Sequence, residues 1–174
     1  NVSLYRAFAW QSLYEGFLHK KVKGEFFLKL CIKHLPQEKN NLVVNRTLSF
    51  LRIIYSTYLD DGSRQLIQDD LERFCINMVN NKAEGKNKKS YFNTLLSICS
   101  SPKSCSYLSS VLKGEQDLPE DVTINEQDKI SIAFNLVLRD TSVYEDTKAY
   151  IMRTIKNKDI LKRFEYVYHS LSDD

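Results

Sequence analysis

The side chains best suited to acid–base chemistry in this sequence are its three histidines. Glu15 and His19 stand four residues apart, a spacing that would align a carboxylate and an imidazole on one face of a helix. No nucleophile or third group accompanies the pair, so the spacing is more typical of two surface side chains. His34 and His169 each fall near the end of a predicted helix, where a positive imidazolium suits the negative end of the helix dipole. We therefore interpret all three histidines as structural.

Three pairs of adjacent carboxylates, Asp60/Asp61, Asp69/Asp70 and Asp173/Asp174, could in principle form a catalytic dyad. Neighbouring side chains on a helix point about 100° apart, so these pairs do not share a proton as a dyad must. The sequence also lacks the H-E-x-x-H zinc motif, the G-x-S-x-G elbow, the P-loop and the G-x-G-x-x-G loop. We expect no catalytic, metal-ligating or cofactor-binding residue in this chain, and the sequence assigns no substrate-binding residue.

Four cysteines are spread along the chain without C-x-x-C spacing. Cys31, Cys75 and Cys99 fall among apolar neighbours, where thiols usually act as small buried hydrophobes. Structural zinc sites use closer pairs, so we do not expect zinc on these four residues. The spacing would also allow a disulfide between Cys99 and Cys105 across a turn, which leaves the redox compartment open.

The elements that must position these residues are predicted to be helices. Five Gly and three Pro in 174 residues disfavour turn-rich β folds and glycine-loop nucleotide folds. Apolar side chains recur at helical spacing, as at Trp10, Leu13 and Phe17, and no comparable period-2 run appears. The pattern predicts nine helices with mostly short connections, near 3–18, 24–35, 41–59, 63–81, 87–100, 102–113, 124–139, 142–155 and 158–171.

Short loops make consecutive helices antiparallel neighbours. We therefore predict an all-α fold, an irregular HEAT-like helical solenoid of about nine antiparallel helices, forming a single helical domain over residues 1–174. Ser101 before Pro102, Asn87 and Asn157 are predicted N-caps. The remaining boundary signals are two predicted capping boxes, Thr123-x-x-Glu126 and Ser142-x-x-Glu145, and three predicted helix exits or turns, Asp61-Gly62, Glu84-Gly85 and Lys113-Gly114.

Charge is unevenly distributed, although the net charge is only +3. Residues 1–59 hold nine Lys/Arg and three Asp/Glu, whereas 115–128 hold six acids and no base. These are most simply solvated helix faces and an exposed loop; the alternative is a basic surface that meets an acidic partner, a neighbouring domain or a peptide carboxylate. We expect no nucleic-acid partner and no membrane span, since no apolar run approaches about 18 residues. The first residue is Asn1, so we expect a piece of a longer or processed chain, of unassigned localisation.

The segment from Arg6 to Leu13 resembles the R-x-x-x-W-x-S-L opening of a known helical domain. This is the C-terminal domain of zinc aminopeptidases of the aminopeptidase N family, akin to that of the endoplasmic-reticulum aminopeptidases. Phe26 to Pro36 is similar to its F-x-x-L-x-x-x-H-L-P helix. Later segments follow in the order of that domain: Leu112 to Gly114 with the acidic loop, Asp128 to Ala133, and Phe164 to Ser172.

The resemblance implies a parent enzyme, a metallopeptidase, that removes N-terminal residues from peptides with a zinc ion on an upstream domain. The family's zinc ligands and its substrate-amine glutamates match nothing in this sequence, so no catalytic residue is carried over. For this chain the resemblance implies a helical bowl that caps the active-site chamber and shapes peptide access. Its expected partners are the catalytic domain of the same parent chain and peptide substrates. A free-standing HEAT-like scaffold that binds a protein partner is the alternative.

Overall fold

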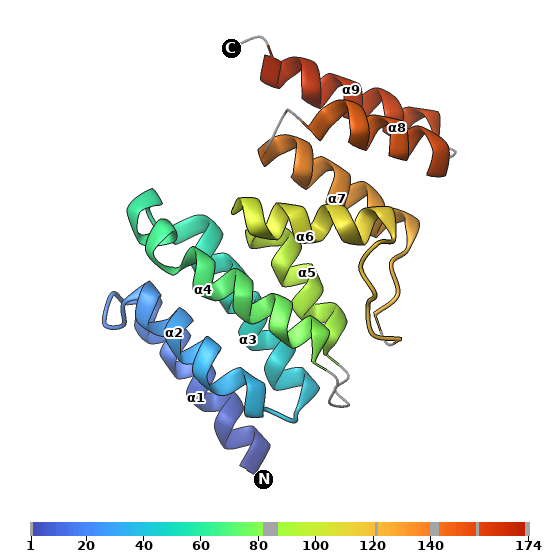
Figure 1. Cartoon of the computed structure of the whole chain (residues 1–174). Coiled ribbons are helices and arrows are strands. Elements are labelled where there is room, and N and C mark those ends of the chain that lie inside the picture. Colours follow the sequence, from blue (N-terminus) through green and yellow to red (C-terminus); the bar gives the residue numbers. More distant parts are fainter. Residues whose placement is uncertain (1, 82–86, 121, 140–142, 156, 173–174) are drawn as a thin grey trace. The chain divides into compact units, whose positions relative to one another are not determined.

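The computed structural model describes residues 2–81, 87–120, 122–139, 143–155 and 157–172 (Figure 1). Within these ranges the chain forms nine α-helices and no strand, which confirms the predicted all-α fold. The irregular solenoid stays a prediction. The helices are α1 (Val2–Leu18), α2 (Gly24–His34), α3 (Asn41–Ile53), α4 (Asp61–Asn80), α5 (Lys88–Ile98), α6 (Pro102–Lys113), α7 (Glu126–Arg139), α8 (Tyr144–Thr154) and α9 (Lys158–Ser172). No helix among the described residues is both long enough and apolar enough to cross a membrane.

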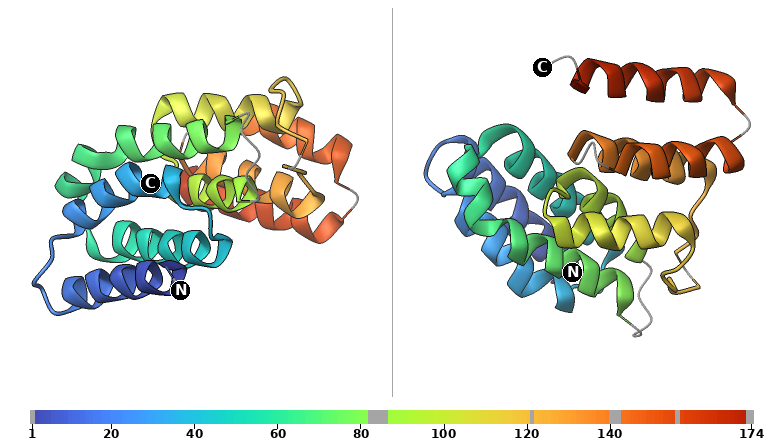
Figure 2. Two further views of the ribbon diagram at one scale, coloured as in Figure 1. Left: turned by 90° about the horizontal axis from the view of Figure 1, so that it is seen from below. Right: turned by 45° about the horizontal axis from the view of Figure 1, so that its top comes forward.

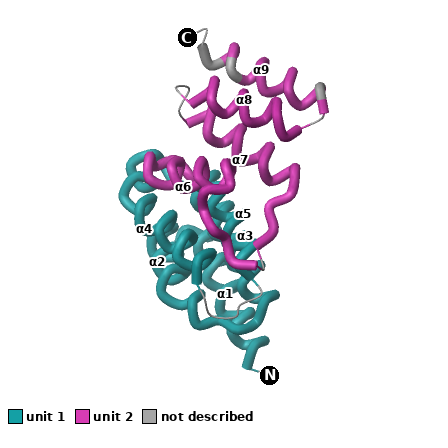
Figure 3. The backbone as a smooth tube through the Cα atoms, turned by 45° about the vertical axis from the view of Figure 1, so that its right-hand side comes forward, with its two compact units in different colours: residues 1–98 teal, residues 99–174 magenta. Residues whose placement is uncertain are grey.

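The chain divides into two compact units, Asn1–Ile98 and Cys99–Asp174 (Figure 3). Unit 1 contains α1 to α5 and unit 2 contains α6 to α9. The single helical domain predicted over residues 1–174 would contain both units, and it stays a prediction.

In unit 1, helix α2 packs against α1, α3 and α4, and α5 packs against α3 and α4. Figure 2 shows α1 and α3 side by side in this unit. The core is formed mainly by apolar side chains of α2 to α5. Of the predicted stripe Trp10, Leu13 and Phe17 on α1, only Trp10 is buried, and the other two are half-buried. The most deeply buried side chains of the core include Phe27, Leu28, Cys31, Leu48, Leu51, Ile54, Ile67, Leu71, Cys75, Phe92 and Leu95.

Helix α3 does not continue as one regular helix to residue 59, as the sequence predicts. It passes into a π-helical turn, η2 (Ile54–Tyr58), in which the amide of Leu59 donates to the carbonyl of Ile54. A π turn holds an extra residue per turn, so the side chains after it face a different direction. The helical spacing in the sequence predicts one buried stripe over Val44, Leu48, Leu51, Tyr55 and Tyr58. Tyr58 is instead 56% exposed, and Leu59 is buried in its place.

The start of α2 lies against this turn at a position that only glycine can occupy without a shift. A Cβ atom on Gly24 would lie 2.8 Å from Leu59 Cδ2 and 3.1 Å from Ile54 Cγ2. The absence of a side chain therefore allows the side chains of Leu59 and Ile54 to pack directly on the backbone of α2.

In unit 2, α7 packs against α6, α8 and α9, and α8 packs against α9. Phe164 lies at the centre of an aromatic cluster, with ring centroids 5.4 Å from both Phe134 and Tyr144. Val122, in the acidic connection between α6 and α7, is also buried. The long connection is thus anchored to the core by one apolar residue.

Several helix ends agree with the sequence-based prediction. Ser101 Oγ accepts from the amide of Ser104, and Asn157 Oδ1 accepts from the amide of Asp159. Gly114 ends α6 with a left-handed φ of 73°, a conformation that suits glycine. Asn87 precedes α5, and its carbonyl accepts from the amide of Tyr91. Its side chain, however, donates to Asn41 Oδ1 at the start of α3.

Two predicted boundaries are wrong. The capping box is formed by Asn125 and Asp128, whose side chains accept from each other's amides at 2.9 and 2.8 Å, two residues after the predicted Thr123. Asp61-Gly62 is not a helix exit but the start of α4, which Asp60 caps by accepting from Ser63 N. The signals at Ser142 and at Glu84-Gly85 lie outside the described residues.

Candidate functional site

The sequence-predicted acid–base pair is a surface feature. His19 follows the end of α1, and its backbone amide donates to the carbonyl of Glu15 at 2.9 Å. The Glu15 carboxylate accepts from Gln11 Nε2 at 3.0 Å. Both Glu15 and His19 are exposed, and neither lines any of three cavities found among the described residues. His34 ends α2, as predicted.

The adjacent carboxylates have structural partners. Asp60 caps α4, and hydrogen bonds to Ser63 lower its pKa below the ordinary value. Asp61 pairs with Arg64 at 2.9 Å, and Asp70 pairs with Arg73 on the same helix. Asp173 and Asp174 lie outside the described residues. Within the described part of the chain, no group of three or more His, Cys, Asp or Glu side chains is placed to hold a metal ion.

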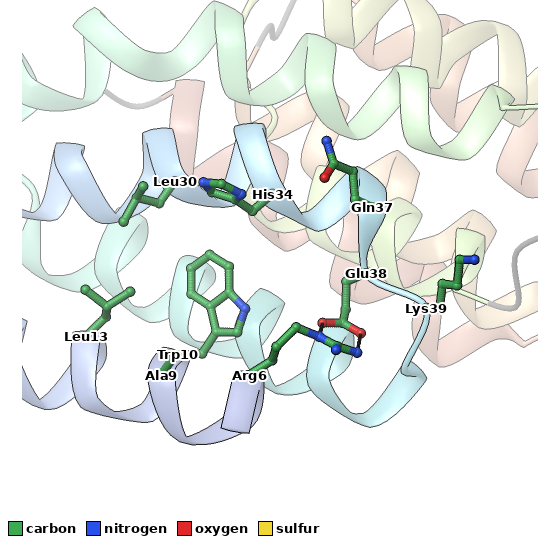
Figure 4. A pocket seen from close by; sticks show the side chains of 9 residues that line it. All are labelled: Arg6, Ala9, Trp10, Leu13, Leu30, His34, Gln37, Glu38 and Lys39. Atoms are coloured by element: carbon green, nitrogen blue, oxygen red, sulfur yellow. Dashed lines mark hydrogen bonds and ion pairs between the residues drawn. The ribbon is translucent and has the colours of Figure 1, made fainter. Parts of the chain in front are cut away.

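A cavity of unit 1, here called the α1–α2 pocket, has a volume of about 500 Å³. Figure 4 shows the side chains that line it. This volume lies within the range of about 300–1,000 Å³ typical of ligand sites. Its lining residues are Arg6, Ala9, Trp10 and Leu13 from α1, Leu30 and His34 from α2, and Gln37, Glu38 and Lys39 from the segment that follows.

Trp10 forms the floor of the α1–α2 pocket. Its side chain is 9% exposed, and its ring meets Phe27 of α2 edge to face with centroids 5.6 Å apart. In Figure 4, Leu13 and Leu30 lie at one end of the pocket and His34 lies above the indole ring. The pocket is therefore apolar at its floor and polar at its rim.

An ion pair closes the other end of the pocket. Arg6 Nε and Nη2 donate to the two carboxylate oxygens of Glu38 at 2.6 and 2.9 Å, and Glu38 also accepts from Asn40 N. The Glu38 side chain is only 4% exposed. The hydrogen bond from Arg6 lowers the pKa of Glu38 and, reciprocally, raises that of Arg6. The charge of Arg6 is thus compensated within the protein.

The remaining basic residues of the pocket are at its rim. His34 and Lys39 are both exposed, and Lys39 lies beyond Glu38 on the side away from Trp10. The lining contains no Ser, Thr or Cys, so the arrangement suits holding a ligand rather than attacking it. An apolar side chain could lie on Trp10 while an acidic group meets the rim.

The basic excess of residues 1–59 is not gathered at this pocket. Lys20, Lys21 and Lys23 are exposed in the connection from α1 to α2. Arg46 instead lies over the ring of Phe50 on α3, 4.7 Å from its centroid. Sequence reasoning identified the charge excess but not the pocket, because the Arg6–Glu38 pair joins residues 32 positions apart.

Comparison with known proteins adds no relative: no family model, curated protein or solved structure matches the chain.

Proposed function

We propose that this chain is the non-catalytic C-terminal domain of a zinc-dependent aminopeptidase, capping the active-site chamber and shaping peptide access. One observation carries the proposal: the two segments with the clearest resemblance to that domain pack on each other and enclose the α1–α2 pocket. The R-x-x-x-W segment supplies Arg6 and Trp10, and the F-x-x-L-x-x-x-H-L-P segment supplies Leu30 and His34.

The lining of the pocket suits part of a peptide. The indole of Trp10 with Leu13 and Leu30 offers an apolar surface for an aliphatic or aromatic side chain. The Lys39 ammonium at the rim could attract a peptide carboxylate. Since Arg6 is neutralised by Glu38, Lys39 is the cation of the lining that we assign to this role. The chain would contact the peptide away from the zinc ion, which belongs to the upstream domain.

Charge reversal at the rim tests this role in the full-length enzyme. Lys39→Glu is expected to raise KM for long peptides about fivefold, the size of an exposed charge contact of roughly 1 kcal/mol, and to leave short substrates unchanged. The matched control is Lys29→Glu, an equally exposed lysine of unit 1 that does not line the pocket. An unchanged KM for long peptides in the Lys39→Glu enzyme would refute the assignment.

The catalytic part of the proposal is tested with the 174-residue chain alone. A peptidase assay with added zinc should give no turnover, because the chain carries none of the family's zinc ligands or substrate-amine glutamates. Measurable turnover that persists through purification would overturn the assignment to a non-catalytic domain.

The outer face of α1 supports a second candidate, a free-standing scaffold that binds a protein partner. Leu4, Tyr5 and Phe8 are 54%, 74% and 61% exposed on this helix, an apolar group of the kind found where proteins meet. Under the first proposal, the covering surface would be the catalytic domain of the same parent chain. Under the second, it would be a separate protein.

The coding sequence upstream of Asn1 separates the two candidates. An H-E-x-x-H motif followed by a glutamate further along would decide for the aminopeptidase. A different upstream region, together with a partner whose binding is lost in a Tyr5→Glu/Phe8→Glu chain, would decide for the scaffold.

A further inference from the structure

Two cysteines in unit 2 lie in contact beside a cavity that the proposed function does not use. The sulfur atoms of Cys99 and Cys105 are 3.8 Å apart. Cys99 directly follows α5, and Cys105 lies in the first turn of α6, so five residues separate them. All four cysteines of the chain are thiols in the structure. A disulfide bond requires a sulfur–sulfur distance of about 2.05 Å, so the two sulfur atoms would have to approach further to form one.

The two thiols differ in their access to solvent. Cys99 is 1% exposed, whereas Cys105 is half-buried and lines a cavity of about 520 Å³. Cavities of this size admit small molecules. A reagent dissolved in water would therefore meet Cys105 first, and Cys99 only through Cys105.

The thiolate is the form of a cysteine that attacks a disulfide, and neighbouring positive charge is what favours it in general. Lys113 and Arg139 line the same cavity, together with one opposing charge, Glu115. Cys105 also lies near the N-terminus of α6, where the helix dipole favours negative charge. Arg139 is held beside the pair, because its Nε donates to the carbonyl oxygen of Cys99 at 3.1 Å.

We propose that Cys99 and Cys105 are a redox-active pair that forms a reversible intramolecular disulfide, with Cys105 as the attacking thiol. The proposal is independent of the function proposed for the pocket in unit 1. The oxidant is a low-molecular-weight disulfide, such as oxidised glutathione.

The reaction proceeds by two thiol–disulfide exchanges. The deprotonated Cys105 sulfur attacks one sulfur of the oxidant, whose S–S bond breaks, and the other half leaves as a thiolate that takes up a proton. The Cys99 thiolate then attacks the Cys105 sulfur in this mixed disulfide and releases the second half as a thiol. The protein loses two electrons and two protons, and the oxidant is reduced to two thiols.

The other two cysteines provide an internal control. Cys31 and Cys75 are 0% exposed in unit 1, and burial raises the pKa of both thiols. Neither lines any of the cavities described above. An oxidant in water that leaves unit 1 folded should therefore leave both as thiols.

The test is oxidation of the folded 174-residue chain with oxidised glutathione, followed by thiol counting after denaturation. We expect two of the four thiols to be lost, the mass to fall by two hydrogens, and peptide mapping to join Cys99 to Cys105. Dithiothreitol should restore all four thiols. Retention of four thiols, or a bond that joins two chains, would overturn the proposal.

Single variants test the order of attack. In Cys99→Ser, Cys105 should accumulate as a mixed disulfide, seen as one added glutathionyl group. In Cys105→Ser, Cys99 should stay a thiol, and an equally fast loss of Cys99 would overturn the assigned order. Circular dichroism checks that each variant is folded. Should a variant not fold, the order is tested on the wild-type chain with less than one equivalent of a maleimide. Cys105 should then be labelled before Cys99, and labelling of Cys99 first would contradict the order.

Discussion

The cysteines of the two units lie in different surroundings. In unit 1, Cys31 and Cys75 lie in the centre of a helical core, fully buried, and burial raises their pKa. In unit 2, Cys99 is buried but touches Cys105, which lines a cavity beside two cationic side chains. Contact with a more accessible thiol, rather than burial alone, distinguishes Cys99 from Cys31 and Cys75.

The ion pairs of the two units also differ, both in the burial of the carboxylate and in the number of hydrogen bonds. Arg6 and Glu38 in unit 1 form two hydrogen bonds, and the carboxylate is almost completely buried. Lys148 and Glu165 in unit 2 form one contact at 3.0 Å, with the carboxylate side chain 45% exposed. A doubly hydrogen-bonded pair with a buried carboxylate fixes two segments, whereas a pair with a half-exposed carboxylate adds little to stability.

The largest expected effect on stability comes from truncating a side chain in the core of unit 1. Phe27→Ala should reduce the free energy of unfolding by about 4 kcal/mol, because it leaves a cavity beneath Trp10. Trp10 is the only tryptophan in the sequence and lies in unit 1, so its fluorescence during urea unfolding reports on this unit. The matched variant is Phe164→Ala in unit 2. If Phe27→Ala and Phe164→Ala shift the urea midpoint of the Trp10 fluorescence change equally, the two units unfold together. The difference in stability between the units would then be lost.

Thiol labelling measures the difference between the cysteines of the two units directly. Cys31 and Cys75 should react with a maleimide at least about 100-fold more slowly than Cys105, because they are reached only when unit 1 opens. Quenched samples analysed by mass spectrometry after digestion give the rate at each cysteine. The prediction is wrong if Cys75 reacts as fast as Cys105 in the folded chain.

Removing the buried carboxylate should have a smaller effect. Glu38→Gln is expected to lower the free energy of unfolding by about 1.5 kcal/mol at neutral pH, since two charge-assisted hydrogen bonds are weakened. Glu165→Gln in unit 2 is the matched control, with an expected loss below about 0.5 kcal/mol. Urea unfolding of both variants measures the difference, and equal losses would contradict the contrast between the pairs.

The Glu38 variant also has a predicted pH dependence. Because the pKa of Glu38 is lowered in the folded chain, its ionised form stabilises the fold above the unfolded pKa of about 4.3. This contribution is lost as the pH falls through the lower, folded value. The stability difference between wild type and Glu38→Gln should therefore be constant near neutral pH and shrink in acid. A stability difference between wild type and Glu38→Gln that grew on acidification would contradict this prediction.

The smallest effects concern two glycines. Gly114→Ala should cost about 1 kcal/mol, because alanine disfavours the left-handed φ that ends α6. Gly62→Ala in α4 should instead stabilise the chain by about 0.5 kcal/mol, since the added Cβ meets Asp60 only at 3.4 Å. Thermal unfolding of the two variants should give shifts of opposite sign.

Local sequence signals predicted most of the fold. The helices, the caps at Ser101 and Asn157 and the burial of Cys31, Cys75 and Cys99 depend on neighbours within a few residues. The predicted start of α7 is wrong because Thr123 and Asn125 are each followed three residues later by an acid. The backbone conformation determines which of the two residues caps the helix.

The candidate sites could be predicted only in part, since they depend on residues far apart in the sequence. The α1–α2 pocket depends on Glu38 reaching Arg6 across a whole helix and turn. The spacing of Cys99 and Cys105 allowed a disulfide, and their contact lies within the turn from α5 to α6. The cavity beside them also takes residues from α7 and therefore follows from how α6 packs on α7. Periodicity shows which face of a helix is buried, and it does not show which neighbour covers that face.

The π turn at Ile54–Tyr58 has a consequence at the level of the gene. Such a turn is an α-helical turn with one residue inserted, so a single codon separates it from a regular helix. Deleting an exposed residue there, Ser56 or Thr57, would allow α-helical geometry but would rotate Leu59 away from Gly24. A one-codon deletion in this segment should therefore be tolerated less well than one in the exposed connection that follows α1.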